Sequence, residues 1–181
     1  MNKFLVLLSV FAVTFACKTP EARKPETVKT GSYIAESVVR NKKLYEAEEK
    51  AIETYIKTHD TKQFKASEYG FWVAKDSIVV EATNSKFPKF SDVVNFDFNI
   101  SALDGQIIYT ASELKNKNYS MDQEELFTGL REGLKLMKAG ETYTFIFPSQ
   151  KAYGYYGDEN RIGRNTPIIS TVTINSIITK K

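Results

Sequence analysis

The sequence predicts an α+β protein in which an antiparallel β-sheet is wrapped around one short α-helix, preceded by a long N-terminal amphipathic helix. Three observations support this class. Apolar residues recur at helical spacing before residue 60, they alternate with other residues after residue 64, and one short helical stretch interrupts the alternation. At 181 residues with 42% hydrophobic content, the chain is long enough for one packed domain with extensions and short for two.

The first seventeen residues have the pattern of a secretory signal peptide. A positively charged start, Met1 to Lys3, precedes an apolar stretch over 4–15 that is too short to span a bilayer. The stretch ends in Thr14-Phe-Ala-Cys17, which resembles a bacterial lipobox, where the cysteine becomes acylated. The sequence therefore predicts a lipoprotein anchored through Cys17 in the cell envelope, on the periplasmic side of the outer membrane. The alternative is an ordinary signal peptide followed by a free thiol.

Two segments separate the signal peptide from the sheet domain. Residues 18–31 are rich in Pro, Lys, Thr and Glu, which predicts a disordered tether. Residues 32–60 predict the long helix, because they lack Pro and Gly and place apolar side chains on one face, namely Ile34, Val38, Tyr45, Ile52 and Ile56. This stripe is expected to be buried against the domain or in a homodimer with a second copy, and a client polypeptide is the alternative.

Residues 64–181 are predicted to form the sheet domain. Strands are expected where apolar or β-branched residues alternate with others, over 69–73, 77–82, 94–100, 106–109, 142–147 and 171–178. Asp104-Gly105 marks a tight hairpin turn. The short helix is predicted over 128–137, with Thr128 as its N-cap and Gly140 in the turn that follows.

Composition argues against several functions. The formal charge of +3 is spread along the chain without a basic run interleaved with aromatics, so no nucleic-acid partner is expected. The single cysteine excludes an internal disulfide and a thiolate cluster. The lone His59 has no Cys, Asp or Glu at ligand spacing, so neither a metal nor a cofactor is expected.

Three motifs follow one another in the predicted sheet domain. Residues 126–140 read L-F-T-G-L-R-E-G-L-K-L-M-K-A-G, Phe147-Pro148 is followed by Ala152-Tyr153-Gly154, and Leu103-Asp104-Gly105 lies upstream. In order and spacing they resemble the patterns V-I-x-G-W-x-E-G-L-x-x-M-x-x-G, I-P-x-x-x-A-Y-G and L-x-D-G of FKBP-type peptidyl-prolyl isomerases. With the lipobox and the N-terminal helix, the layout also resembles the gliding-motility-associated FKBP-type lipoproteins.

The resemblance implies a peptidyl-prolyl cis-trans isomerase, or rotamase, that acts on proline-containing polypeptide clients and assists the folding of exported envelope proteins. It also implies an aromatic pocket beside the short helix. The alternative is a catalytically weak or inactive chaperone or binding module in an envelope complex for gliding motility or secretion. A purely structural subunit of such a complex is a third reading.

Site residues follow from matching the motifs. The resemblance implies catalytic roles for Tyr153 through its hydroxyl, for Phe127 through its backbone N–H, and for Phe98. The substrate-binding residues that it implies are Ile108, Tyr109, Tyr119, Leu126, Leu130 and Ile162.

The chain departs from the family pattern at several of these positions. Tyr109 replaces an aspartate, so a carboxylate is expected to be missing, and Leu130 replaces a tryptophan. Ser170 falls where the family has an aromatic residue that closes the pocket, and Ile162-Gly163-Arg164 replaces an I-P-P loop. A larger and less aromatic pocket with weak turnover is therefore expected.

Overall fold

The structure, a computed structural model, describes residues 31–59, 62–78 and 86–180. The predicted signal peptide with Cys17, the predicted tether up to residue 30 and part of the strand predicted over 77–82 lie outside these residues. By its internal contacts the chain divides into a unit of residues 1–37 and a unit of residues 38–181. The described part of the first unit is the beginning of helix α2, and every tertiary contact discussed below lies within the second.

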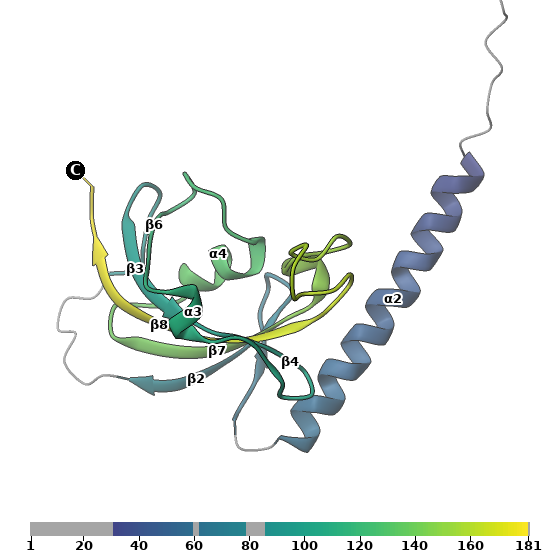
Figure 1. The fold of residues 1–181 in the computed structure, drawn as a ribbon, viewed down its shortest axis with the longest axis horizontal. Coiled ribbons are helices and arrows are strands. Elements are labelled where there is room, and N and C mark those ends of the chain that lie inside the picture. The colour runs from purple at the N-terminus through teal and green to yellow at the C-terminus, as the bar shows by residue number, and fades with distance from the viewer. Residues whose placement is uncertain (1–30, 60–61, 79–85, 181) are drawn as a thin grey trace, which may run out of the picture. The chain divides into compact units, whose positions relative to one another are not determined.

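The described residues form the predicted α+β arrangement of an antiparallel sheet with a few helices (Figure 1). The helical elements are α2 (Gly31–Thr58), α3 (Ala111–Leu114), α4 (Thr128–Leu134) and the 3-10 turn η1 (Ser149–Lys151). The strands are β1 (Lys65–Ala66), β2 (Trp72–Ile78), β3 (Val93–Phe98), β4 (Ile100–Ala102), β5 (Ile107–Tyr109), β6 (Lys117–Ser120), β7 (Glu141–Phe147) and β8 (Ile168–Ile178). Strands β1 and β6 and the helical elements α3 and η1 were not predicted from the sequence.

Strand β8 is central to the sheet. The strand order is β1-β2-β7-β8-β3-β6, and β4 pairs with both β8 and β5. Eleven residues long, β8 therefore contacts β7 on one side and the consecutive strands β3 and β4 on the other. A register shift between Asn95 and Phe96 bends β3 along β8. This curvature lets the sheet close around α4, which lies against one of its faces (Figure 1).

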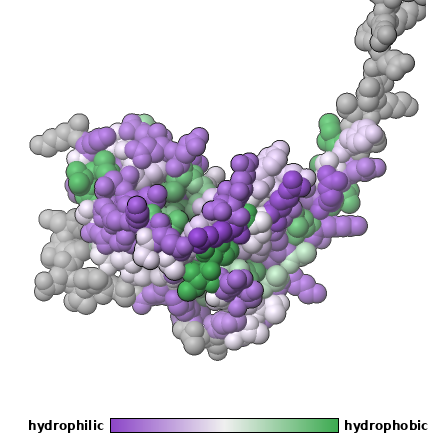
Figure 2. Space-filling view, viewed as in Figure 1, coloured by the Kyte–Doolittle hydropathy of each residue, from purple (hydrophilic) through white to green (hydrophobic). Residues whose placement is uncertain are grey.

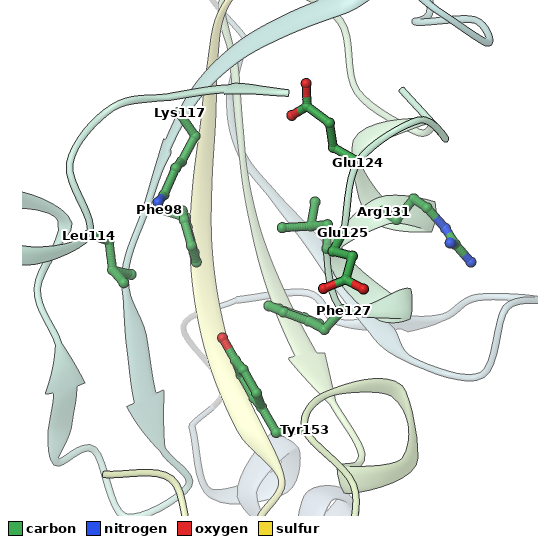
Figure 3. Close-up of a pocket in the computed structure, with 9 residues that line it drawn as sticks. Phe98, Leu114, Lys117, Glu124, Glu125, Phe127, Arg131 and Tyr153 are labelled. Carbon is green, nitrogen blue, oxygen red and sulfur yellow. The ribbon is translucent and has the colours of Figure 1, made fainter. Parts of the chain in front are cut away.

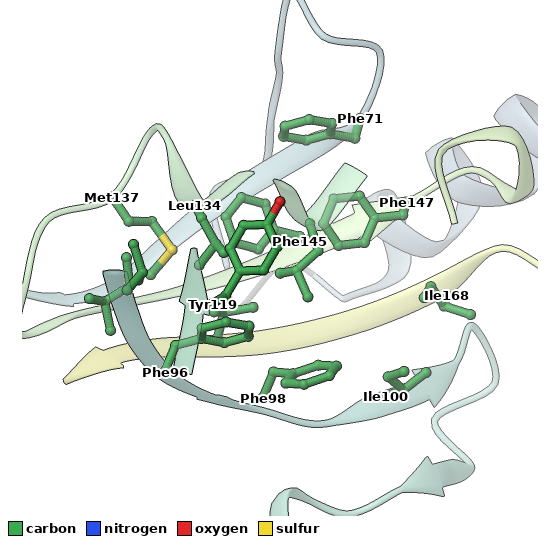
Figure 4. Close-up of a cluster of buried hydrophobic side chains, with 14 of the residues drawn as sticks. Phe71, Phe96, Phe98, Ile100, Tyr119, Leu134, Met137, Phe145, Phe147 and Ile168 are labelled. Carbon is green, nitrogen blue, oxygen red and sulfur yellow. The ribbon is translucent and has the colours of Figure 1, made fainter. Parts of the chain in front are cut away.

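The two faces of the sheet carry two separate cores, because successive strand residues point to opposite sides. In β7, Phe145 and Phe147 belong to the large cluster around α4, whereas Ile146 between them belongs to a smaller cluster. Figure 4 shows the aromatic part of the large cluster, in which the rings of Phe145 and Phe147 stack at 5.3 Å and Phe71 meets Phe147 edge to face. The predicted alternation of β3 is seen directly, since Val94, Phe96 and Phe98 are buried.

Two glycines allow α4 to approach β7 closely. A Cβ on Gly129 would lie 2.5 Å from Cδ1 of Phe147 and 2.7 Å from the carbonyl oxygen of Lys151, both far inside contact distance. A Cβ on Gly133 would lie 3.1 Å from the ring of Phe145. The glycines of the G-L-x-E-G motif therefore serve packing of the helix against the sheet.

The start of α4 differs from the prediction. The N-cap is Phe127, with extended φ and ψ of −61° and 142° and no side-chain hydrogen bond, while Thr128 is the first helical residue. The prediction of Thr128 as a cap was wrong because tertiary packing of Phe127 against Phe147, not a local cap, fixes the entry into the helix.

Helix α2 buries only part of its predicted apolar stripe. Ile52 is fully buried with Ile146 and Ile169 in the smaller cluster, and Ile56 packs against it. Ile34 and Val38, earlier on the same stripe, are 64% and 61% exposed. None of the described helices combines the length and the apolar character that a membrane span needs. The face seen in Figure 2 is mostly hydrophilic, with hydrophobic side chains in separate small areas.

Replacing Gly129 by alanine tests the close approach of α4. In an ordinary helix this change stabilises by up to about 1 kcal/mol. Here we expect it to lower the free energy of unfolding by about 1–3 kcal/mol, because the new Cβ overlaps Phe147 and the Lys151 carbonyl. Denaturant unfolding measures the effect, and Gly133→Ala, whose Cβ meets only a ring at 3.1 Å, should cost less. A Gly129→Ala protein as stable as the wild type would contradict this account.

Candidate active site

A pocket of about 630 Å³ opens beside the N-terminus of α4. Its walls come from β3, α3, β6, the segment before α4, α4 itself and the loop after η1. The lining residues are Phe98, Leu114, Lys117, Glu124, Glu125, Leu126, Phe127, Arg131 and Tyr153 (Figure 3). Elements that are far apart in the sequence therefore meet at one hollow, with apolar walls and a charged rim.

Tyr153 provides a hydroxyl at the pocket wall. Its ring lies 5.2 Å from that of Phe127, which in turn packs edge to face on Phe147 at 5.4 Å. The hydroxyl points toward the space bounded by Leu114, Phe98 and Phe127 (Figure 3). Burial is the main cause that raises the pKa of Tyr153 to about 12, and the nearby Asp158 charge is the second. Tyr153 is therefore a neutral hydrogen-bond donor at any physiological pH.

The turn that carries Tyr153 is held by its own backbone. The carbonyl oxygen of Ser149 accepts hydrogen bonds from the N–H groups of Ala152 at 3.0 Å and Gly154 at 2.8 Å, on either side of Tyr153. Gly154 adopts a φ of +63°, which glycine takes without strain. Its carbonyl accepts the N–H of Asn165 at 2.9 Å and thereby closes the loop. The A-Y-G motif is thus a turn that presents the tyrosine ring.

Phe127 contributes both its ring and a backbone donor. Its carbonyl accepts the N–H of Arg131 in the first turn of α4. Within the described part of the chain, the backbone N–H of Phe127 has no hydrogen-bond acceptor. Helix N-termini leave such donors unpaired, and the partial positive charge there favours an electron-rich partner.

A carboxylate lies beside Tyr109, although none was expected there. The Tyr109 hydroxyl donates to Oδ2 of Asp158 at 2.5 Å, and Oδ1 accepts the N–H groups of Ile162 and Asn160 at 2.7 and 3.0 Å. Burial opposes ionisation of Asp158, but these hydrogen bonds outweigh it and hold the pKa of its carboxyl below the usual value. The same bond to Asp158 raises the pKa of Tyr109.

Arg161 fastens this loop to the elements before it. Its guanidinium donates to the carbonyl oxygen of Ile108 at 2.9 Å and to Glu113 at 2.7 Å, and it lies over the Tyr109 ring. The pKa of Glu113 is lowered to about 2, mainly by the hydrogen bond from the N–H of Thr110 and next by the one from Arg161. The loop after η1 is therefore anchored to β5 and α3 by Tyr109, Glu113, Asp158 and Arg161, which do not themselves line the pocket.

The structure brings four of the nine predicted site residues to the pocket: Phe98, Leu126, Phe127 and Tyr153. Three others, Tyr119, Leu130 and Ile162, are buried in the adjoining core, with 3%, 0% and 3% exposure. Ile108 and Tyr109 are half-buried and pack against the same core outside the pocket walls. Ser170 is also fully buried, and its hydroxyl donates to the carbonyl of Asn99 at 2.7 Å.

The charged rim was not predicted from the sequence. Glu124, Glu125 and Lys117 are exposed residues that line the pocket, and Nε of Arg131 lies 3.7 Å from Asp122 and 3.5 Å from Glu132. Their loop and helix positions resemble ordinary solvated surface, so no sequence signal marked them. Among the described residues, no group of three or more His, Cys, Asp or Glu side chains is arranged to hold a metal ion.

The curved sheet, the helix it encloses and the aromatic pocket at that helix define an FKBP-like domain, as the motifs indicated. A family model described as FKBP-type peptidyl-prolyl cis-trans isomerase matches residues 84–175, about half of the chain. The chain belongs to this family.

Two curated sequences are similar to the chain. Outer membrane protein MIP of Legionella longbeachae is 26% identical over 99 residues, which are 55% of this chain and 42% of that protein. A probable FKBP-type peptidyl-prolyl cis-trans isomerase FkpA of Neisseria meningitidis is 26% identical over 152 residues, or 77% of this chain and 55% of that protein. The chain thus spans about half the length of these curated relatives.

Solved structures show the same fold. A peptidyl-prolyl cis-trans isomerase from Pseudomonas syringae superposes with a TM-score of 0.57 at 18% identity, covering 76% of this chain and 96% of that one. FkpA from Escherichia coli superposes with a TM-score of 0.58 at 22% identity, covering 98% of this chain and 82% of that one.

The raised pKa of Tyr153 predicts its behaviour at high pH. The folded state keeps this proton up to about pH 12, whereas an unfolded tyrosine loses it near pH 10. The contribution of neutral Tyr153 to the free energy of unfolding is therefore complete below pH 10 and is lost as the pH rises toward 12. The difference in tyrosinate absorbance between wild type and Tyr153→Phe should appear near pH 12 in the folded protein. A difference centred near pH 10 would show that the ring is solvated.

Proposed function

We propose that the chain is a peptidyl-prolyl cis-trans isomerase that acts on proline-containing polypeptides and assists the folding of exported envelope proteins. The observation that carries this proposal is the pocket that is lined by the Phe98 and Phe127 rings together with Tyr153, whose hydroxyl is a neutral donor. Membership of the FKBP-type family supports the same activity. The pocket volume of about 630 Å³ suits a prolyl ring with its neighbouring residues.

The chemistry requires no nucleophile. Rotation about an X–Pro bond has a barrier of about 20 kcal/mol because the amide is conjugated. Twisting the bond breaks the conjugation and makes the amide less polar, so an apolar pocket that excludes water favours the twisted state over the planar one. In this pocket the Phe98 and Phe127 rings supply the apolar walls.

Two donors are available to hold the substrate while the bond rotates. The Tyr153 hydroxyl and the Phe127 N–H are suited to bind carbonyl groups of the polypeptide next to the prolyl ring. The anchored loop of Asp158 and Arg161 keeps the segment around Tyr153 in place. The carboxylate that the sequence lacks at Tyr109 is thus present in the network, from Asp158.

Tyr153→Phe tests the hydroxyl. We expect kcat/KM for a proline-containing peptide to fall about fivefold, the equivalent of one net hydrogen bond, without loss of folding. Tyr156→Phe is the matched control, because Tyr156 is 74% exposed and outside the pocket walls. Equal rates for the two variants would remove Tyr153 from the mechanism, and a folded wild-type protein without any rate above background would end the proposal of catalysis.

A second candidate is a binding module that holds clients without turnover. The exposed rings of Tyr155 and Tyr156 favour it, because they lie on the loop of Tyr153 and pair edge to face at 5.2 Å. Exposed aromatic side chains offer apolar area to a partner, and exposed apolar patches mark interaction sites. Suppression of client aggregation without isomerisation of the peptide would support this binding role. The module would then serve an envelope complex such as that of gliding motility or secretion.

We further propose that the chain is a lipoprotein held by acylated Cys17 at the outer membrane, facing the periplasm. The lipobox-like end of the first seventeen residues supports this, and one relative is named as an outer membrane protein. The exposed Ile34 and Val38 of α2 offer an apolar surface for the predicted homodimer.

Cys17→Ser tests the anchor. Acyl chains bind membranes by about 0.8 kcal/mol per buried methylene, so the wild-type protein should stay in the membrane fraction after washing with salt. The variant should move to the soluble fraction and lose incorporation of labelled fatty acid. Retention of the variant in the membrane fraction would show that something other than acylation holds the chain there.

A further inference from the structure

Glu48 of α2 is a buried carboxylate outside the pocket. It is only 6% exposed, while Glu46 and Glu49 on the same turn of the helix are exposed. A charge is buried in a protein at a high cost unless hydrogen bonds replace its water. Glu48 has such bonds, since the N–H of Ser149 donates to Oε2 at 2.9 Å and the Ser149 hydroxyl donates to Oε1 at 2.6 Å.

Ser149 connects this carboxylate to the turn of Tyr153. It is 1% exposed and is the first residue of η1, directly after Pro148. Its donors are bound by Glu48, and its carbonyl oxygen accepts the N–H groups of Ala152 and Gly154. One residue thus joins helix α2 to both neighbours of the site tyrosine.

The helix itself is fixed one turn further along. Ile52 packs with Ile146 and Ile169 on the face of the sheet opposite α4. Because β7 ends at Phe147, this cluster also fixes the helix relative to the start of the loop that contains Ser149. Glu48 is therefore presented to Ser149 from a rigid element.

We propose that Glu48 is a positioning residue for Tyr153. Helix α2 would then contribute to the isomerase site through this carboxylate. The inference rests on the proposed function for its effect on catalysis. Removing the carboxylate leaves the N–H and hydroxyl of Ser149 buried without acceptors, and the turn 149–154 relaxes to solvate them. The Tyr153 hydroxyl then spends less time at the position that stabilises the rotating bond.

The experiment uses the full chain and compares Glu48→Ala with Glu49→Ala, the exposed neighbour on the same helix. The first measurement is amide hydrogen exchange, which does not depend on activity. For Glu48→Ala we expect the N–H groups of Ala152 and Gly154 to exchange about fivefold faster, while amides in β7 and β8 keep the wild-type rate. Glu49→Ala should change neither set.

The second measurement is a double-mutant cycle on kcat/KM. Glu48→Ala should lower kcat/KM about fivefold in the wild-type background and much less when Tyr153→Phe is already present, because it acts through the hydroxyl. Additive losses, or faster exchange throughout the sheet, would assign Glu48 a purely structural role and overturn the inference. Unchanged exchange at Ala152 and Gly154 would overturn it as well.

Two further arms keep the result decisive. If Glu48→Ala does not fold, Glu48→Gln replaces it, since the amide keeps one acceptor and loses the other, and a smaller change confined to the same amides is expected. If the wild-type protein shows no isomerisation, the proposed function fails, and the exchange measurement alone decides whether Glu48 positions the Tyr153 turn.

Discussion

The close contact between α4 and β7 is the constraint on which the rest of the site depends. Gly129 faces the Phe147 ring on one side and the Lys151 carbonyl on the other, and only a residue without Cβ fits between them. Phe147 supports the ring of Phe127, and Lys151 lies two residues before Tyr153. One steric condition therefore sets the separation of the two aromatic walls of the pocket.

Around this contact, several positions differ from the family pattern. Positions that departed from the family pattern turn out to be supported by other residues: Tyr109 is bonded to Asp158, and the Ser170 hydroxyl is satisfied by Asn99. Leu130 is buried in the core and does not line the pocket. The hydrogen-bond partner of a substituted motif position can therefore come from a loop far away in the sequence, as Asp158 does for Tyr109.

The loop after η1 is held from three directions. Arg161 and Asp158 attach it to β5 and α3, the Ser149 carbonyl shapes its first turn, and Glu48 binds that turn from α2. These contacts hold the loop that carries Tyr153, and a fixed donor position is what the proposed isomerisation would need. Within residues 38–181, the hydrogen bond from Ser149 to Glu48 thus connects helix α2 to the turn that carries Tyr153.

The sequence alone predicted the fold class, the family and most strands of the sheet domain. The alternation in β3 predicted the sheet and the spacing of apolar residues over 128–137 predicted the short helix, because both are local periodicities, while the order of the three motifs indicated the FKBP-type family by resemblance. Only the tertiary structure decided that four predicted residues line the pocket while Leu130, Tyr119 and Ile162 are buried. It also decided that Asp158 meets Tyr109 from 49 residues away and that Glu48 meets Ser149 from 101. Such pairs leave no local pattern, since the path of the folded backbone, and not their neighbours in sequence, brings them within bonding distance.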